Sequence, residues 1–322
     1  MGSAEFIREI VTRIENSVGG AVLGQNETAR LIAGAYIIGG HVLLEGPPGI
    51  AKTLLAKSFA QILGASFKRI QFTPDLMPSD ITGVSVFDRE SATFRFVPGP
   101  VFADIVLADE VNRAPPKTQS ALLEAMEERT VTVDGECHAL HEQFFVIATQ
   151  NPIEHEGTFP LPEAQLDRFL FRLLMNYPNK DAEEAMIQKL SSSVGSAPAV
   201  LPRAIQGSDL LRARQCLREI TLAPTVSDYL MQLVISSRTH PKLLLGSSPR
   251  AALNVALAAK FFAALQGRDY VIPDDVQSAI RPVLNHRLVI KPEMVEGSGT
   301  ALSIIDEIVE KTPVPEHIAE HA

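Results

Sequence analysis

The sequence has no tryptophan, only two cysteines, no long apolar run and no excess of basic residues. Its 322 residues include 29 basic and 38 acidic ones, which gives a net charge of −9 at pH 7. Cys137 and Cys216 lie far apart and form no C-x-x-C pair, so we expect no disulfide framework and a reducing, cytoplasmic setting. Runs such as FVIAT are too short to span a bilayer, and no secretory signal is evident. Because the acidic charge also disfavours nucleic acid, we expect neither a membrane nor nucleic acid as partner.

Apolar runs of strand length alternate with helical patterns in the first part of the chain. Apolar residues recur at helical spacing from Phe6 to Val18, and a second helix is expected from Glu27 to Ile38. A Gly-Gly pair follows each of them and ends the helix. This alternation predicts an α/β fold with a mostly parallel sheet and helices on both faces. The expected strands are 41–45, 68–72, 104–110, 143–150 and 169–175.

Two hairpins are expected to interrupt the alternation. One lies within 84–98 and has a polar turn between two β-prone arms, and the other lies at 130–142 with Asp134-Gly135 as its turn. Hairpins that project from an α/β core usually form contact surfaces or working parts. The aromatic residues of the first hairpin, Phe87, Phe94 and Phe96, either grip a client protein or pack beneath the hairpin.

The composition changes after Tyr177. Segment 191–207 is rich in Ser, Pro, Gly and Ala, which indicates a linker or long loop. Beyond it only helical patterns occur, at 208–219, 225–240, 249–266, 273–285 and 300–311. We therefore predict an α/β domain at 1–190, a linker at 191–207 and a helical domain at 208–322.

The segment GPPGIAKT at 46–53 departs at one position from the phosphate-loop pattern G-x-x-x-x-G-K-[ST]. In such a loop backbone N–H groups hold phosphate oxygens, the lysine reaches the β- and γ-phosphates, and the hydroxyl binds Mg²⁺. Lys52 and Thr53 are present, but Ala51 replaces the second glycine. Glycine is needed only where φ is positive or a Cβ would strike the ligand, and we expect Ala51 to be right-handed. A Gly/Pro-rich turn that happens to precede Lys-Thr is the alternative.

Acidic and amide side chains follow two of the expected strands. DIVLADE ends in Asp109 and Glu110 at the strand edge where ligands bind in open α/β sheets. Asp109 is suited to hold Mg²⁺, through water, and Glu110 to orient and polarise an attacking water. Asn151 follows the next strand and either contacts the γ-phosphate and water or simply forms an Asn-Pro turn.

Two arginines stand at positions that favour an anionic neighbour. Arg168 lies just before the last expected strand, and Arg250 follows a serine and a proline at the start of a helix. A cation at a helix N-terminus opposes the helix dipole, so an anion nearby would explain it. Taken singly, each arginine is more simply a solvated surface residue.

Together these segments resemble the MoxR family of AAA+ ATPases. The resemblance runs from about Val22 to Pro282, and its most specific parts are IVLADEVNRAPPKTQSALLEAMEE, VIATQNPIEHEGTFPLPEAQLDRF and SSPRAALNVALAAK. It implies an AAA+ P-loop NTPase core with a small helical C-terminal lid, and ATP and Mg²⁺ as cofactors. Alanine before the Walker A lysine is common in this family. The nucleotide-binding residues that it implies are Val22, Leu23, Gly24, Gly46, Pro47, Pro48, Gly49, Ile50, Ala51, Lys52, Thr53 and Leu54.

The resemblance also implies roles for the polar residues. Asp109 and Glu110 match Walker B, with Thr53 and Asp109 as the magnesium residues, and Asn151 matches sensor 1. Arg168 matches the arginine finger that acts on a neighbouring subunit, and Arg250 matches sensor 2 reaching from the lid. Arg113, in EVNRAP, is a further candidate at the interface between subunits.

The family implies an ATP-hydrolysing chaperone that forms a homo-oligomeric ring, expected to be a hexamer, and that remodels, assembles or activates a client complex. Insertion of a metal or cofactor is one form of that task, and a separate von Willebrand factor A domain protein is the expected partner. The alternatives are the ATPase subunit of a metal chelatase, a nucleic-acid motor and a scaffold that does not hydrolyse ATP. Glu110 and Arg168 argue against the scaffold, and the acidic charge argues against the nucleic-acid motor.

Other polar residues carry weaker hypotheses. Cys137, His138 and His141 suggest a metal site, but residues i and i+3 of a strand point to opposite faces and no second ligand pair lies nearby. His155 lies in a loop near the expected site, and three roles stay open for it: a structural role, contact with a client, and catalysis.

Overall fold

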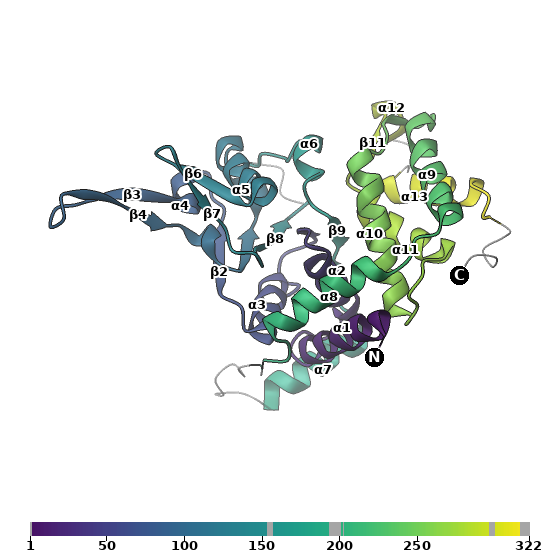
Figure 1. The fold of residues 1–322 in the computed structure, drawn as a ribbon, viewed down its shortest axis with the longest axis horizontal. Coiled ribbons are helices and arrows are strands. Elements are labelled where there is room, and N and C mark those ends of the chain that lie inside the picture. Colours follow the sequence, from purple (N-terminus) through teal and green to yellow (C-terminus); the bar gives the residue numbers. More distant parts are fainter. Residues whose placement is uncertain (1, 153–156, 193–200, 202, 296–299, 316–322) are drawn as a thin grey trace.

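The computed structural model of the chain describes residues 2–152, 157–192, 201, 203–295 and 300–315. Its centre is a parallel five-stranded sheet with strand order β2-β5-β8-β1-β9 (Figure 1). Each strand overlaps one that the sequence predicts, so the expectation of an α/β fold with a parallel sheet is confirmed. The strands are β1 (Val42–Glu45), β2 (Phe67–Gln71), β5 (Ile105–Asp109), β8 (Phe145–Gln150) and β9 (Phe171–Leu174).

Apolar side chains cover both faces of this sheet. Alternation along β1 places Val42 and Leu44 in one hydrophobic cluster and Leu43 in the other. The first cluster contains α1 (Ser3–Gly19), α2 (Asn26–Ile38), α3 (Lys52–Leu63) and C-terminal helices, and the second contains α4 (Pro78–Thr82) and α5 (Pro116–Glu128). Burial on both faces explains why the three central strands, β5, β8 and β1, read as continuous apolar runs.

Both predicted hairpins are present. The first pairs β3 (Gly83–Asp88) with β4 (Thr93–Pro98), and the second pairs β6 (Thr130–Val133) with β7 (Glu136–Ala139) around Asp134-Gly135. The β3–β4 hairpin extends far from the body of the molecule, on the side opposite the C-terminal helices (Figure 1). Short 3₁₀ turns flank β5, η1 (Pro100–Phe102) before it and η2 (Val111–Arg113) after it.

Helices follow the sheet, but they are not the only regular structure there. Leu243–Leu245 (β10) and Val289–Ile290 (β11) form a small antiparallel pair, so the prediction of helices alone beyond the linker was wrong. Segments of three and two residues are too short to show a strand periodicity. A short helix, α6 (Glu163–Leu166), precedes β9, and the helices after β9 are α7 (Lys180–Ser192), α8 (Gly207–Glu219), α9 (Pro224–Thr239), α10 (Pro249–Leu265), α11 (Pro273–Leu284), α12 (Pro292–Val295) and α13 (Ala301–Lys311).

The C-terminal helices pack on the same apolar cluster as α1 and α2. Part of the predicted linker, 193–200 and 202, lies outside the described residues. The domain boundaries at 190 and 207 therefore stay predictions. No helix in the described part of the chain is long and apolar enough to cross a membrane.

Candidate active site

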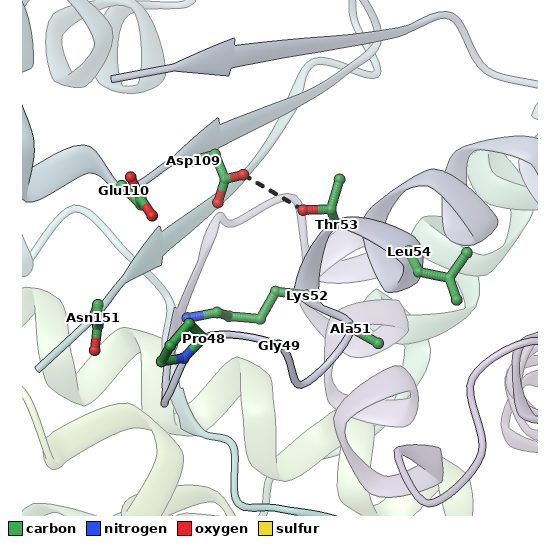
Figure 2. Close-up of a pocket in the computed structure, with 9 residues that line it drawn as sticks. All are labelled: Pro48, Gly49, Ala51, Lys52, Thr53, Leu54, Asp109, Glu110 and Asn151. Atoms are coloured by element: carbon green, nitrogen blue, oxygen red, sulfur yellow. Dashed lines mark hydrogen bonds between the residues drawn. The ribbon is translucent and has the colours of Figure 1, made fainter. Parts of the chain in front are cut away.

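A cavity of about 390 Å³ opens at the carboxyl edge of the sheet. The chain leaves β1, β5 and β8 at this edge, which is where ligands bind in open α/β sheets. All the residues that line it were predicted to bind phosphate or metal or to act in catalysis. Figure 2 shows them: Pro48, Gly49, Ala51, Lys52, Thr53, Leu54, Asp109, Glu110 and Asn151.

The loop between β1 and α3 can follow its path only with glycine at particular positions. A Cβ on Gly46 would lie 2.5 Å from the carbonyl oxygen of Met175, so no side chain fits there. Gly49 has a left-handed backbone, with φ of 81°. α3 begins directly after the loop, and its free N–H groups and dipole favour an anion. The remaining predicted loop residues, Gly46, Pro47 and Ile50, belong to this loop without lining the cavity.

Ala51 does not have the expected backbone conformation. It is left-handed, with φ 64° and ψ 25°, so the prediction of a right-handed residue was wrong. The chain must reverse direction between Gly49 and the first turn of α3, and Ala51 takes up that reversal. A left-handed residue with a Cβ costs roughly 1–2 kcal/mol relative to the right-handed form. The common pattern therefore has glycine at this position because the backbone is left-handed there, and alanine adopts the same conformation only with strain.

Lys52 and Thr53 start α3 and face the cavity. The ammonium of Lys52 lies inside the loop and donates to the carbonyl oxygen of Gly46 at 2.7 Å. Thr53 Oγ1 lies 3.4 Å from Asp109 Oδ2, the contact drawn in Figure 2. The hydroxyl and the carboxylate thus converge from two different elements, as a shared cation would require.

Asp109 is 8% exposed and has several partners. Its Oδ1 accepts from Thr149 Oγ1 at 2.6 Å. Its Oδ2 accepts from Arg69 Nη2 at 2.7 Å and from Arg69 Nε at 3.0 Å. Sequence reasoning missed Thr149 and Arg69. The only available signal was the position of polar residues on the strands beside β5, and strand order is not visible in a sequence.

Glu110 follows Asp109 in a left-handed conformation, with φ of 57°. Backbone strain of this kind is common at functional sites. Its amide donates to Thr149 Oγ1 at 2.8 Å, while its carboxylate accepts from Gln71 at 2.8 Å and from Arg113 at 2.9 Å. Arg113, predicted at a subunit interface, here pairs with the glutamate of its own chain. The carboxylate that was predicted to activate water is held in place by two donors.

The remaining predicted residues of this edge differ in position. Asn151 follows β8, is buried and lines the cavity. Val22, Leu23 and Gly24 do not line it. A Cβ on Gly24 would lie 3.2 Å from both Pro178 and Ala182, so this segment packs on the chain that follows β9. Its assignment to adenine stays a prediction.

Arg168 and Arg250 lie away from this cavity. Both line a second hollow with His41, which precedes β1, and Leu170, which precedes β9. This hollow is at the amino edge of the parallel sheet, opposite the phosphate loop. Glu127, at the end of α5, joins the two arginines: Arg168 Nε and Arg250 Nη1 each lie 3.0 Å from one of its oxygens.

His41 underlies this second hollow. Its Nδ1 accepts from the amide of Val146 at 3.0 Å, and its Nε2 lies 3.2 Å from the carbonyl oxygen of Met126. Burial, with a smaller contribution from the charge of Arg129, lowers the pKa of His41 to about 3. The ring is therefore a neutral connector between β8 and α5.

The suspected metal residues have other partners. The ring of His138 stacks on Phe96 at 4.0 Å between centroids, and His141 Nδ1 lies 2.6 Å from Asp104. Within the described ranges no group of three or more histidine, cysteine or acidic residues could hold a metal ion. Cys137 and Cys216 are both free thiols, and His155 lies outside the described residues.

The donors at the carboxyl edge fit a nucleotide with a divalent cation. Oxygen ligands, a hydroxyl and a carboxylate, are those that Mg²⁺ takes alongside substrate phosphates. The loop offers a helix N-terminus and an ammonium for the phosphates. A strand–loop–helix of this kind, together with a neighbouring strand that ends in Asp-Glu, defines a nucleotide-hydrolysing protein of the P-loop class.

Comparisons with known proteins agree with this class. Residues 41–171 match the family model described as "ATPase family associated with various cellular activities (AAA)", and 235–308 match an AAA lid domain. Chaperone MoxR1 of Mycobacterium tuberculosis is 39% identical over 98% of this chain and 86% of its own. An uncharacterised Bacillus subtilis protein, YeaC, is 42% identical over 98% of both chains. A crystal structure from Cytophaga hutchinsonii, named provisionally as an ATPase, is 36% identical, with a TM-score of 0.89 over 98% of this chain and 97% of that one.

The chain belongs to the MoxR family of AAA+ ATPases. A Paracoccus denitrificans protein named MoxR, 31% identical over 94% of this chain and 95% of its own, supports the same assignment. The expected ATPase activity, the AAA+ fold and the C-terminal lid are thereby confirmed.

Proposed function

We propose that this ATPase is a magnesium-dependent remodelling chaperone whose active site is completed by a second copy of the chain. The observation that carries the proposal is the separation of the catalytic groups over two edges of one sheet. Lys52, Asp109 and Glu110 lie at the carboxyl edge, whereas Arg168 and Arg250 line a hollow at the amino edge. Arginines so placed can reach a phosphate only on a neighbouring subunit.

The residues of the carboxyl edge divide the work on ATP. Lys52 turns from the Gly46 carbonyl to the β- and γ-phosphates, and Thr53 and Asp109 hold the cation between them. A Mg²⁺ ion held there would supply positive charge against the negative charge that develops during phosphoryl transfer. Glu110 orients the attacking water, and Asn151 fixes its position or contacts the γ-phosphate.

Arg168 and Arg250 act together from the neighbouring subunit. The family resemblance implies that Arg250 reaches from the lid, and its pairing with Glu127 favours action on the nucleotide of a neighbouring subunit rather than on that of its own chain. Each guanidinium has five N–H donors, so bonding to Glu127 leaves donors for a phosphate. Arg250 lies in the first turn of α10, whereas Arg168 directly precedes the sheet strand β9. A phosphate that binds both arginines therefore moves the C-terminal helices relative to the sheet.

The cellular task follows from the family and from one surface. The β3–β4 hairpin exposes Val86, Phe87 and Phe94 far from the body of the molecule, where a client protein can reach them. We assign the contact with the client to this hairpin. In this proposal the chain forms a hexameric ring in the cytoplasm and works with a separate protein that has a von Willebrand factor A domain. Client assembly or activation, by metal or cofactor insertion, is the proposed outcome.

The test is Mg²⁺-dependent ATP hydrolysis measured against protein concentration for the wild type, Glu110→Gln and Arg168→Ala. We expect a specific activity that rises with concentration and is lost in both variants, while Glu110→Gln still binds ATP. A specific activity that is independent of protein concentration and persists in Arg168→Ala would contradict an active site shared between two copies of the chain.

A further inference from the structure

A positive side chain holds the carboxylate that is expected to bind magnesium. Arg69 lies on β2, the edge strand that pairs in parallel with β5. Its Nη2 and Nε lie 2.7 Å and 3.0 Å from Oδ2 of Asp109. Two donors on one oxygen make this a close, charge-assisted contact.

The oxygen that Arg69 holds is also the one that faces Thr53. Thr53 Oγ1 lies 3.4 Å from Oδ2, whereas Oδ1 accepts from Thr149. A divalent cation shared by Thr53 and Asp109 must approach Oδ2, within a few ångströms of the guanidinium. Like charges at that distance repel, and the repulsion doubles for a divalent ion. Arg69 and the cation therefore compete for one oxygen.

We propose that Arg69 is the counter-cation of Asp109 in the empty site and must leave Oδ2 when the divalent cation arrives with the nucleotide. The inference rests on the proposed use of Mg²⁺ at this site. Arg69 thereby sets how strongly the cation adds to nucleotide affinity. Its side chain is about half exposed, at 48%, and lies on an edge strand, so it can swing into solvent without disturbing the core.

The movement also reaches the neighbouring carboxylate. Arg69 Nη2 donates to Gln71 Oε1, and Gln71 Nε2 donates to Glu110 Oε2 at 2.8 Å. When Arg69 leaves, Gln71 loses one of its two partners in this network. Binding of the cation at Asp109 is in this way coupled to the hydrogen bond by which Gln71 positions Glu110.

The experiment measures ADP binding by titration calorimetry, with excess Mg²⁺ and separately with EDTA. ADP is not hydrolysed, so the readout is independent of activity. The quantity is the ratio of the two dissociation constants, without and with Mg²⁺. For Arg69→Gln we expect this ratio to rise about fivefold, the weight of one partly exposed ion pair. Arg69→Lys keeps the charge and is expected to stay near the wild-type ratio.

Two further variants complete the design. Lys68→Gln removes the same charge from the neighbouring residue of β2, whose side chain points to the other face, and is expected to leave the ratio unchanged. Arg69→Met is a second uncharged variant that must reproduce the rise if Arg69→Gln folds poorly. An unchanged or lower ratio in the uncharged variants overturns the role of Arg69. A wild type that binds ADP without any effect of Mg²⁺ overturns instead the proposed function.

Discussion

Replacing Ala51 by glycine tests whether the phosphate loop carries backbone strain. Ala51 has φ 64°, a conformation that costs an alanine roughly 1–2 kcal/mol and a glycine almost nothing. Two effects oppose the gain. Glycine leaves the unfolded chain freer by about 0.4–1 kcal/mol, and losing a half-buried methyl group costs about 0.4 kcal/mol more. We therefore expect Ala51→Gly to change the free energy of unfolding by between about −0.4 and +1.2 kcal/mol, where a positive value means a more stable protein.

A matched control is available on α10. Ala252 is also partly buried and packs against the same cluster as Ala51, but it lies within a helix. Ala252→Gly loses the same methyl group and gains no relief of strain, so it should destabilise the protein by about 1 kcal/mol or more. The two identical substitutions should differ by about 1.5 kcal/mol.

Urea unfolding followed by far-ultraviolet circular dichroism measures both variants, since the chain has no tryptophan to report by fluorescence. ADP affinity should be unchanged in Ala51→Gly, because glycine permits the same loop conformation. Equal destabilisation by Ala51→Gly and Ala252→Gly would refute the reasoning, as it would show no strain at position 51.

Other predictions concern stability and the hairpin. His41 and His286 are buried, and desolvation lowers both pKa values in the folded chain, so only the unfolded chain binds protons below about pH 6.5. The free energy of unfolding is then full only well above that pH, and it falls by about 3 kcal/mol between about pH 7.5 and 5.5, which urea unfolding at each pH measures. His41→Gln should halve this loss of stability. An undiminished loss in that variant would show that protonation of His41 in the unfolded chain does not cause it. Phe94 is 73% exposed on the hairpin, so Phe94→Ala should lower the free energy of unfolding by no more than about 0.5 kcal/mol. In the same assay Phe145→Ala, at a buried position, should lower it by about 3 kcal/mol or more. A large cost at Phe94 would mean that the hairpin needs this ring for folding rather than for contact.

Much of the fold could be predicted because its elements carry strong periodic signals. The three central strands, β5, β8 and β1, are buried on both faces and therefore read as short apolar runs between helices. β10 and β11 escaped prediction because such short segments carry no periodicity and exist only through their mutual pairing.

The site could be predicted where its chemistry is local in the sequence. Lys52, Thr53 and Asp109 occur in motifs whose spacing reflects strand–loop–helix geometry. Arg69 could not be found in this way, because its importance depends on β2 lying beside β5. Glu127 could not either, since the chain brings it to Arg250 only through tertiary packing. The conformation of Ala51 was missed because the path of the loop overrides the preference of the residue.

Mixing two inactive variants tests the shared active site most directly. Glu110→Gln and Arg168→Ala carry lesions that the account assigns to opposite sides of one interface. Mixed at equal amounts, they form some interfaces with an intact Glu110 on one subunit and an intact Arg168 on the next. Random mixing should restore about a quarter of the wild-type rate of ATP hydrolysis. Glu110→Gln mixed with Lys52→Ala, two lesions on the same side, should restore none. Recovery in the first mixture alone is the predicted result, and no recovery in either mixture, with both variants assembled, would contradict a site shared between two copies.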